Sequence, residues 1–268
     1  MWGVSITISI LLVVGVRTIW YLEIAYPPRD SGQVVLMNWA TVDKELAKID
    51  QAFMDEGLPL PVRIPTGIML ETITFGSANE NAVSGYIWQK YPISLSDDII
   101  KKPILTDFLT PDGIYMEELY RFVEDDYEVI GWLFEGNLRQ EPSVDKYPLD
   151  EATVQVQIWP HAFDENFVLV PDLNEYEMMN PSSLPGMSSV LVLENWSQKR
   201  AFFSYRFDKY NTTFGSRRTI KKFHIPDLYY NVIIRRQILS PLTTHGITLL
   251  VVTALMFAVM SVHAESSI

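Results

Sequence analysis

The chain has 268 residues, of which 48% are hydrophobic, and a net charge of −12. A chain this long and this apolar can bury a core, which excludes a disordered polypeptide. The excess of 33 acidic over 21 basic residues argues against nucleic acid as a partner. The lack of cysteine excludes disulfides, thiolate zinc sites and iron–sulfur clusters. The four histidines are too scattered for a metal cluster, so we expect no metal and no cofactor.

The first 26 residues form the first of three predicted parts. Trp2 to Val16 carries no charge, and Arg17 and Glu23 follow. A cleaved signal peptide begins with basic residues and ends at a small-residue cleavage site. No Lys or Arg precedes Arg17, and the only candidate cleavage site is weak. A transmembrane anchor over residues 1–26 is therefore favoured, with a cleaved signal-like segment as the alternative.

Residues 238–263 form the last predicted part, a transmembrane helix. The 25 residues from Ile238 to Val262 carry no formal charge. As a helix they would be about 37 Å long, and the hydrocarbon core of a bilayer is about 30 Å thick. The alternative is a buried core helix. A soluble helix of this length normally has a polar face, so the membrane span is favoured.

Residues 27–237 form the predicted middle domain, which we expect outside the cytoplasm because an apolar start usually directs export. The expected location is a cell membrane, most simply the inner membrane of a bacterium. Pro27 to Met178 contains 28 acidic and 10 basic residues, whereas Met179 to Arg236 contains 3 acidic and 10 basic residues. Two interpretations of the basic stretch remain open: contact with anionic lipid headgroups, and pairing with the acidic part of the same domain.

One amphipathic helix is predicted near the start of the middle domain. Four apolar residues recur at spacings of four, three and four, which places them on one face of a helix: Val42, Leu46, Ile49 and Phe53. Gly57 follows, and Pro59 and Pro61 prevent the helix from continuing.

Short apolar runs separated by turn residues predict strands in the rest of the domain. Ile68–Phe75 and Val83–Tyr91 form a predicted hairpin, and Thr153–Ile158 alternates between apolar and polar residues, as a half-buried strand does. Further strands are predicted at Glu128–Leu138, Phe167–Val170, Ala201–Phe207 and Leu228–Ile234, and a long loop is marked by Pro171, Pro181 and Pro185. The predicted fold is all-β: a single immunoglobulin-like β-sandwich with one N-terminal amphipathic helix, flanked by two transmembrane helices.

Three motifs follow one another along the middle domain. Residues 62–91 form the predicted hairpin with an acidic, asparagine-containing turn and an aromatic second strand, and Lys146–Ile158 (KYPLDEATVQVQI) contains a Tyr-Pro-x-Asp stretch. Asp227–Gln237 (DLYYNVIIRRQ) precedes the apolar span. Together they resemble the Cys-loop type pentameric ligand-gated ion channels, with their Y/F-P-F-D-x-Q motif and their Arg at the membrane surface. The resemblance covers about residues 62–262 and implies a ligand-binding domain followed by a first transmembrane helix.

The sequence also departs from the family pattern. Like bacterial members, it has no cysteine, and Ala152 replaces the Gln of the motif. The first transmembrane helix of the family usually has an internal proline, whereas Pro241 lies earlier here. The given chain ends six residues after Val262, before any pore-lining helix. We expect either a fragment of a channel or a shortened relative with another role.

The resemblance implies that a set of residues couples the sandwich to the membrane: Glu80, Pro148, Asp150, Arg235 and Arg236. Pro148 fixes its own φ and holds Asp150 at the start of a strand. In the family this loop and the first hairpin turn contact the membrane-proximal Arg, which implies charge-assisted bonds from Asp150 and Glu80 to Arg235 or Arg236. A gating motion would alter these bonds. The alternative is that both arginines reach to lipid headgroups.

The resemblance further implies an unidentified small ligand, bound between subunits by aromatic side chains that stack on cationic or amine groups. The matching positions are Tyr86, Trp88, His161, Phe163, Tyr205 and Phe214. Each of them can instead be an ordinary core residue. The implied assembly is a homo-oligomer, a pentamer if the protein is channel-like.

No common enzyme motif occurs: there is no nucleophile elbow, no P-loop, no dinucleotide-binding fingerprint and no zinc-protease motif. The acidic residues at 124–128 indicate a solvated turn rather than a cation site. We therefore expect a non-enzymatic membrane protein whose partners are the lipid bilayer and a small ligand. The alternatives are a membrane-tethered binding or signalling module without channel activity and a structural envelope protein.

Overall fold

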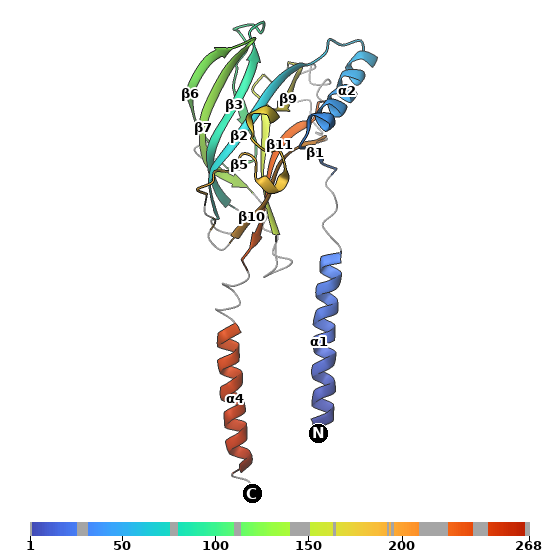
Figure 1. The fold of residues 1–268 in the computed structure, drawn as a ribbon, viewed down its shortest axis with the longest axis vertical. Coiled ribbons are helices and arrows are strands. Elements are labelled where there is room, and N and C mark those ends of the chain that lie inside the picture. Colours follow the sequence, from blue (N-terminus) through green and yellow to red (C-terminus); the bar gives the residue numbers. More distant parts are fainter. Residues whose placement is uncertain are drawn as a thin grey trace. The chain divides into compact units, whose positions relative to one another are not determined.

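The computed structural model describes residues 2–25, 32–75, 80–109, 114–139, 151–162, 165–191, 193, 196–208, 225–237 and 246–265. The chain divides into two compact units, Met1–Gly32 and Gln33–Ile268. The first unit holds helix α1 (Trp2–Ala25). The second unit holds all the strands, helix α2 (Trp39–Asp55) and helix α4 (Ile247–Glu265) (Figure 1).

Helices α1 and α4 occupy the two ends that were predicted to be helical. Large apolar side chains on both are exposed, for example Leu11 and Leu249. In the part of the chain that the structure describes, no helix combines the length and hydropathy needed to cross a membrane. The membrane assignment of both ends stays a prediction.

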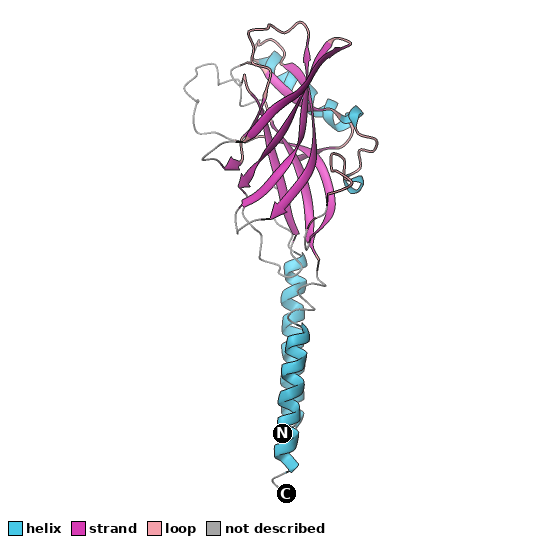
Figure 2. Cartoon of the chain, turned by 90° about the vertical axis from the view of Figure 1, so that its left-hand side faces the viewer, coloured by secondary structure: helices cyan, strands magenta, loops and turns pink. Residues whose placement is uncertain are grey.

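The strands form two sheets packed face to face (Figure 2). Sheet A has five strands, in the order β1 (Val34–Leu36), β10 (Trp196–Arg206), β11 (Asp227–Arg236), β8 (Glu151–Pro160) and β4 (Pro103–Leu105). Sheet B has six, in the order β5 (Phe108–Leu109), β7 (Tyr127–Arg139), β3 (Glu80–Pro92), β2 (Val62–Phe75) and β9 (Phe167–Pro171), with β6 (Tyr115–Glu124) also paired to β7. The prediction of an all-β sandwich with two sheets is therefore confirmed.

The core lies between the two sheets and is filled by the alternating apolar side chains of the strands. On β8, Val154, Val156 and Ile158 point inward and are buried, as their alternation predicts. The opposite face of β8 differs from the expectation of a solvated surface, because Gln157 is only 6% exposed and its amide donates to Asp227 at 3.1 Å. Buried polar side chains are stable when they find such partners.

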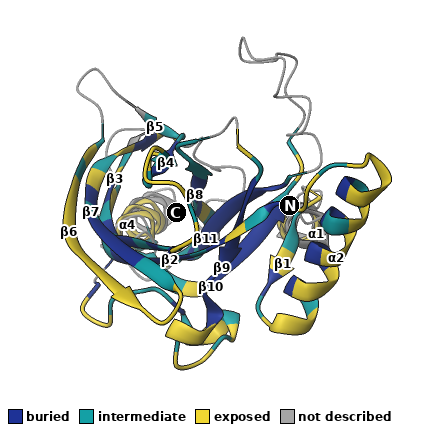
Figure 3. Cartoon of the chain, turned by 90° about the horizontal axis from the view of Figure 1, so that it is seen from above, coloured by how far each residue is buried: buried dark blue, intermediate teal, exposed yellow. Residues whose placement is uncertain are grey.

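Helix α2 is built as its sequence predicts. Asn38 caps it by accepting a hydrogen bond from the Thr41 amide at 2.9 Å, and Gly57 follows its end with a φ of 67°. Figure 3 shows the helix beside β1 with exposed residues along its outer side. Its four predicted apolar residues are buried in the core: Val42, Leu46, Ile49 and Phe53.

Strand β6 was not predicted, because its residues do not alternate between apolar and charged types. It forms an edge of sheet B, and nearly all of its residues are exposed (Figure 3). Arg121 pairs with Glu118 at 2.8 Å and with Glu128 at 2.9 Å. The predicted acidic turn is the tight β6–β7 turn, where Asp125 has a φ of 51°.

Candidate functional site

Residues 172–187, here called the strap, form a surface loop whose two ends lie on β2. The amide of Asp172 donates to the carbonyl of Thr66 at 3.0 Å, and the amide of Ser188 donates to the carbonyl of Leu70 at 2.9 Å. The strap contains two short 3-10 helices, η1 (Leu173–Glu175) and η2 (Pro181–Ser183). It is the long loop that the prolines predict. Compact loops with closely spaced ends are often functional.

A cavity of about 400 Å³ lies between the strap and the outer face of sheet B. We call it the strap cavity. Strand β2 contributes Met69 and β3 contributes Trp88. The strap supplies the remaining lining residues, which are Glu175, Tyr176, Glu177, Met178, Ser183, Pro185, Gly186 and Met187. This volume is in the range of small-molecule sites, and the lining is mostly apolar with a few polar groups, as in such sites.

The indole of Trp88 is fixed on two sides. A Cβ at Gly67 would overlap the indole, so the glycine on β2 gives the ring its place against the sheet. The Trp88 Nε1–H donates to Asp172 Oδ2 at 3.0 Å. The ring also contacts Tyr176, with 5.8 Å between the centroids. Trp88 therefore presents a preorganised aromatic surface to the strap cavity.

Lys90 ties the strap to β3. Its ammonium lies 2.6 Å from Glu175 Oε1 and 3.0 Å from Asp172 Oδ2, and its side chain is only 18% exposed. Burial acts to lower the pKa of Lys90, but hydrogen bonds to Glu175 and Asp172 outweigh it and hold the pKa above its ordinary value. Asp172 thus accepts from both Lys90 and Trp88, and it links the cavity wall to the lysine.

Tyr176 is anchored to the backbone of β2. Its hydroxyl donates to the carbonyl of Ile68 at 3.0 Å and accepts from the amide of the same residue at 2.9 Å. Burial raises the pKa of this hydroxyl far above its ordinary value, so it stays a neutral donor. At the other end of the strap, Gly186 has a φ of 76°, and a Cβ there would collide with the Ile68 carbonyl. The strap can approach β2 this closely because residue 186 is glycine.

No family model and no curated protein matches this chain.

The ends of three strands meet in a ring stack that joins the two sheets, here called the junction. The ring of Phe75, the last residue of β2, lies 5.3 Å from the ring of Trp196, the first residue of β10. The guanidinium carbon of Arg236, the last residue of β11, lies 4.4 Å from the centroid of the Trp196 ring. A cation over an indole in this geometry is attracted to the ring. The chain continues from this end of β11 toward α4.

The structure brings some of the predicted coupling residues to the junction. Arg235 precedes Arg236 and is paired in register with Glu151 on β8. Glu80 begins β3 next to Asn81, which pairs with Phe75, but the Glu80 side chain is outside the described part. Pro148 and Asp150 also lie outside the described residues. The predicted bonds between carboxylates and arginines therefore stay predictions.

The predicted ligand residues are placed in several different environments. Trp88 lines the strap cavity, and Tyr86 lies on the same strand without lining it. Tyr205 is fully buried, and its hydroxyl donates to the carbonyl of Leu169 at 2.6 Å, which places it in the core. His161 is half-buried in the turn after β8. Phe163 and Phe214 lie outside the described residues.

Residues that sequence reasoning missed complete both sites. Tyr176, Asp172 and Lys90 shape the strap cavity, and Phe75 and Trp196 shape the junction. Lys90 carried a usable signal, because it follows Trp88 by two residues and so shares its face of the strand. The other partners are distant in sequence, and no local pattern predicts their contacts.

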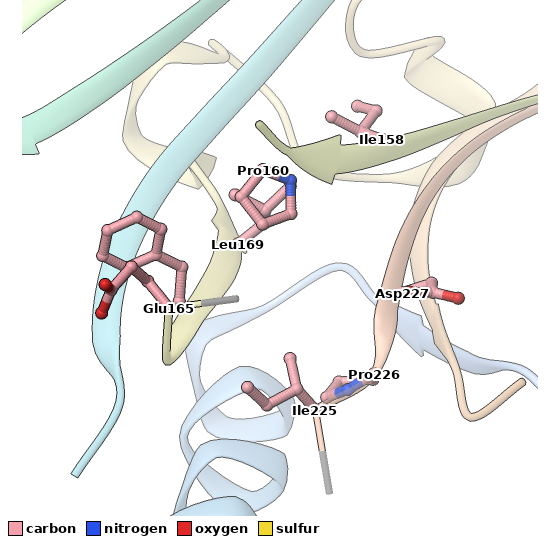
Figure 4. Close-up of a pocket in the computed structure, with 8 residues that line it drawn as sticks. Ile158, Pro160, Glu165, Leu169, Ile225, Pro226 and Asp227 are labelled. Atoms are coloured by element: carbon pink, nitrogen blue, oxygen red, sulfur yellow. The ribbon is translucent and has the colours of Figure 1, made fainter. Parts of the chain in front are cut away.

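A much smaller recess lies between the two sheets, near the start of β11 (Figure 4). It is lined by Ile158 and Pro160 of β8, Leu169 of β9, and Ile225, Pro226 and Asp227. Its volume of about 20 Å³ has room for about one water molecule. Of these two hollows among the described residues, the strap cavity is the one with room for an organic ligand.

Proposed function

We propose that the protein is a membrane-anchored sensor whose β-sandwich binds a small organic cation and couples its binding to the membrane-proximal end of the domain. The observation that carries this proposal is the junction, where Phe75, Trp196 and Arg236 join both sheets at the strand end that leads to α4. The domain resembles the ligand-binding part of a pentameric ligand-gated channel, and the expected assembly is a homo-oligomer in a bacterial inner membrane with the sandwich outside the cytoplasm.

The ligand class follows from the chemistry of the strap cavity. Trp88 and Tyr176 offer aromatic rings, and an aromatic face attracts a cation. Glu177 adds negative charge at the same site, whereas the charge of Glu175 is paired with Lys90. Three methionines, Met69, Met178 and Met187, supply an adaptable apolar wall. These features favour an ammonium group on an apolar or aromatic body.

The membrane part of the proposal rests on exposed apolar surface. Leu249 and Phe257 of α4 are 70% and 68% exposed, and no charged residue interrupts Ile238 to Val262. Contiguous apolar surface of this kind is unfavourable in water, and a lipid bilayer would cover it. Helix α1 has the same character, with Leu11 66% exposed.

The strands that carry the resemblance pair in a consistent way. The predicted hairpin is formed by β2 and β3, and the strand after the Tyr-Pro-Leu-Asp stretch, β8, pairs along its length with the last strand, β11. This arrangement supports the proposal of a ligand-binding domain whose last strand leads toward the membrane.

A second candidate is a membrane-tethered binding module without channel activity. One observation favours it: the strap and sheet B of one sandwich are enough to form a cavity of about 400 Å³. Such a cavity needs no neighbouring subunit to bind a ligand. The mass of the detergent-solubilised protein separates the candidates, because five copies agree with the channel-like assembly and a monomer agrees with the module.

Binding is tested by calorimetry on the full chain in detergent, with tryptamine as the probe and indole-3-ethanol as its neutral analogue. We expect tryptamine to bind and the alcohol to bind at least tenfold more weakly. Trp88→Ala should weaken tryptamine binding at least tenfold, whereas Tyr115→Ala, at an exposed aromatic residue of β6 outside the cavity, should leave it unchanged. Equal binding of amine and alcohol would remove the proposed ligand class.

Membrane anchoring is tested by carbonate washing of membranes from cells that express the full chain. The wild-type chain should stay in the membrane pellet. Leu250→Lys combined with Leu255→Lys on α4 should shift part of it to the supernatant. Leu60→Lys combined with Val190→Lys, which replaces two exposed apolar residues elsewhere, is the matched control and should not. A wild-type chain that is fully released by carbonate contradicts the proposal.

A further inference from the structure

Four aromatic rings form a continuous ladder from the strap cavity to the interior face of sheet A. Trp88 contacts Tyr176 with 5.8 Å between centroids, Tyr176 contacts Phe203 at 5.8 Å, and Phe203 contacts Tyr230 at 5.2 Å. Phe203 belongs to β10 and Tyr230 to β11, and both side chains are fully buried. Tyr176 is therefore the ring of the ladder that lies on the strap and touches both the cavity residue and the core.

The strap has a second contact with β11 at its other end. The hydroxyl of Tyr230 donates to the carbonyl of Pro185 at 2.7 Å, and Pro185 also lines the strap cavity. The hydroxyl lies so near Gly186 that a Cβ there would be in close contact with it. Tyr230 thus contacts the strap directly through its hydroxyl and indirectly through its ring. Protein interiors are close-packed, so a displaced strap must displace these two strands as well.

Phe203 and Tyr230 belong to the two strands that end at the junction. They are direct partners in the β10–β11 register, and the same pairing ends with Trp196 opposite Arg236. Ladder hydrogen bonds hold paired strands together, and between these two residue pairs the register shifts only once, at a β-bulge between Gln198 and Arg200. A shift of Phe203 and Tyr230 therefore reaches the Trp196–Arg236 pair without leaving this hairpin.

We propose that Tyr176 couples the strap cavity to the junction: an occupant that displaces Trp88 or Tyr176 shifts Phe203 and Tyr230, and with them the membrane-proximal end of β10 and β11. The role of a ligand in this coupling rests on the proposed function. The coupling itself is a property of the sandwich and can be measured with no ligand present.

The test is hydrogen–deuterium exchange of the full chain in detergent micelles, read on a peptide that covers residues 228–236. Trp88→Ala removes the cavity end of the ladder, and we expect it to raise exchange in this peptide at least threefold. In a Tyr176→Leu background the same Trp88→Ala change should have less than half of that effect, because the ladder is already broken. Tyr176→Phe keeps the ring and should preserve the full effect of Trp88→Ala. Tyr86→Ala, on the same strand but outside the ladder, is the matched control and should leave the peptide unchanged.

Residues 115–124 of β6 provide the internal reference, because the ladder does not include them. A rise in exchange that is equal in both peptides indicates general loosening and overturns the inference. Additive effects of Trp88→Ala and Tyr176→Leu overturn it as well, and so does an equal response to Tyr86→Ala. A chain that passes this test but binds no tryptamine would retain the coupling and lose only the proposed ligand class.

Discussion

The guanidinium of Arg236 lies over the ring of Trp196, 4.4 Å from its centroid. The same ring contacts Phe75 on the other sheet, so one indole holds a charged residue of β11 and the end of β2. Within the described residues, this stack joins the two sheets at the strand end from which the chain continues to α4. An arginine held over an indole is less free than one that only reaches to lipid headgroups.

Replacing the indole should weaken the stack. Trp196→Leu removes the cation–π contact and part of the apolar contact with Phe75, and we expect it to lower the free energy of unfolding by about 2 kcal/mol. Arg236→Lys keeps the charge but loses the planar stacking and should cost less than Trp196→Leu. Denaturant unfolding of the full chain in micelles measures both. Trp39→Leu, which removes an exposed indole and its hydrogen bond to Asn174, is the control, and an equal loss of stability there would show that the stack contributes no more than an ordinary surface contact.

A methyl group at position 67 should disturb the strap cavity. Gly67→Ala places a Cβ where the Trp88 indole lies, so we expect a loss of about 1–3 kcal/mol in unfolding free energy, the range for overpacking. In a Trp88→Ala background the clash is absent, and the same glycine change should cost less than 1 kcal/mol. Additive losses in the double variant would show that the indole does not occupy this place.

Removal of the Lys90 ammonium should loosen the strap. Lys90→Met leaves the carboxylate of Asp172 buried without its cation and frees Glu175. We expect amide exchange within residues 173–184 to rise about tenfold, which corresponds to about 1.4 kcal/mol. Lys44→Met, which removes an exposed lysine of α2, is the control. Unchanged exchange in Lys90→Met would mean that the strap is held without this tie.

Acid should weaken the sandwich partly through Glu128. A hydrogen bond from Lys101 and, after it, one from Arg121 lower the pKa of Glu128 below its ordinary value of 4.5. The unfolded chain then binds this proton more readily, so the stabilisation is present above pH 4.5 and is lost as the pH falls through the folded-state pKa. Glu128→Gln should remove about 1 kcal/mol at pH 7 and flatten the decline of the melting temperature in acid. A decline as steep as that of the wild type would exclude this contribution.

One substitution tests whether Tyr205 is a core residue or contacts the ligand. Tyr205→Phe removes a hydroxyl that donates to Leu169, and we expect a loss of about 1 kcal/mol in stability because the buried carbonyl loses its donor. Tryptamine affinity should stay within twofold of the wild type. A large change in affinity at unchanged stability would instead favour the ligand role that the resemblance implies.

Sequence patterns predicted the elements whose residues alternate strongly. The apolar stripe from Val42 to Phe53 predicted α2, and the alternation of Val154, Val156 and Ile158 predicted the inner face of β8. Both predictions are possible because the residues buried on one side of a helix or strand recur with the period of that element. Strand β6 was missed because both of its faces are exposed and its charges follow no period. The alternation of the residues around Gln157 predicted that its side chain faces water. In the structure this face of β8 is also covered, so Gln157 is buried.

The sites were harder to predict than the strands. Trp88 was identified from the aromatic strand of the resemblance, but Asp172, Glu175 and Tyr176 reach it across more than 80 residues of chain. Such contacts depend on how the strap leaves β9 and returns to β2, which no local pattern encodes. The Phe75–Trp196–Arg236 stack depends in the same way on the packing of one sheet on the other.

Fluorine NMR of the full chain labelled with fluorotryptophan, titrated with tryptamine, tests the coupling of cavity and junction most directly. The resonances of Trp88 and Trp196 are assigned by Trp88→Phe and Trp196→Phe. We predict that both resonances move with the same midpoint, since one lines the cavity and the other lies under Arg236. A Trp196 resonance that stays fixed while Trp88 titrates would contradict the coupling, whereas two resonances that do not respond at all would contradict the proposed ligand class.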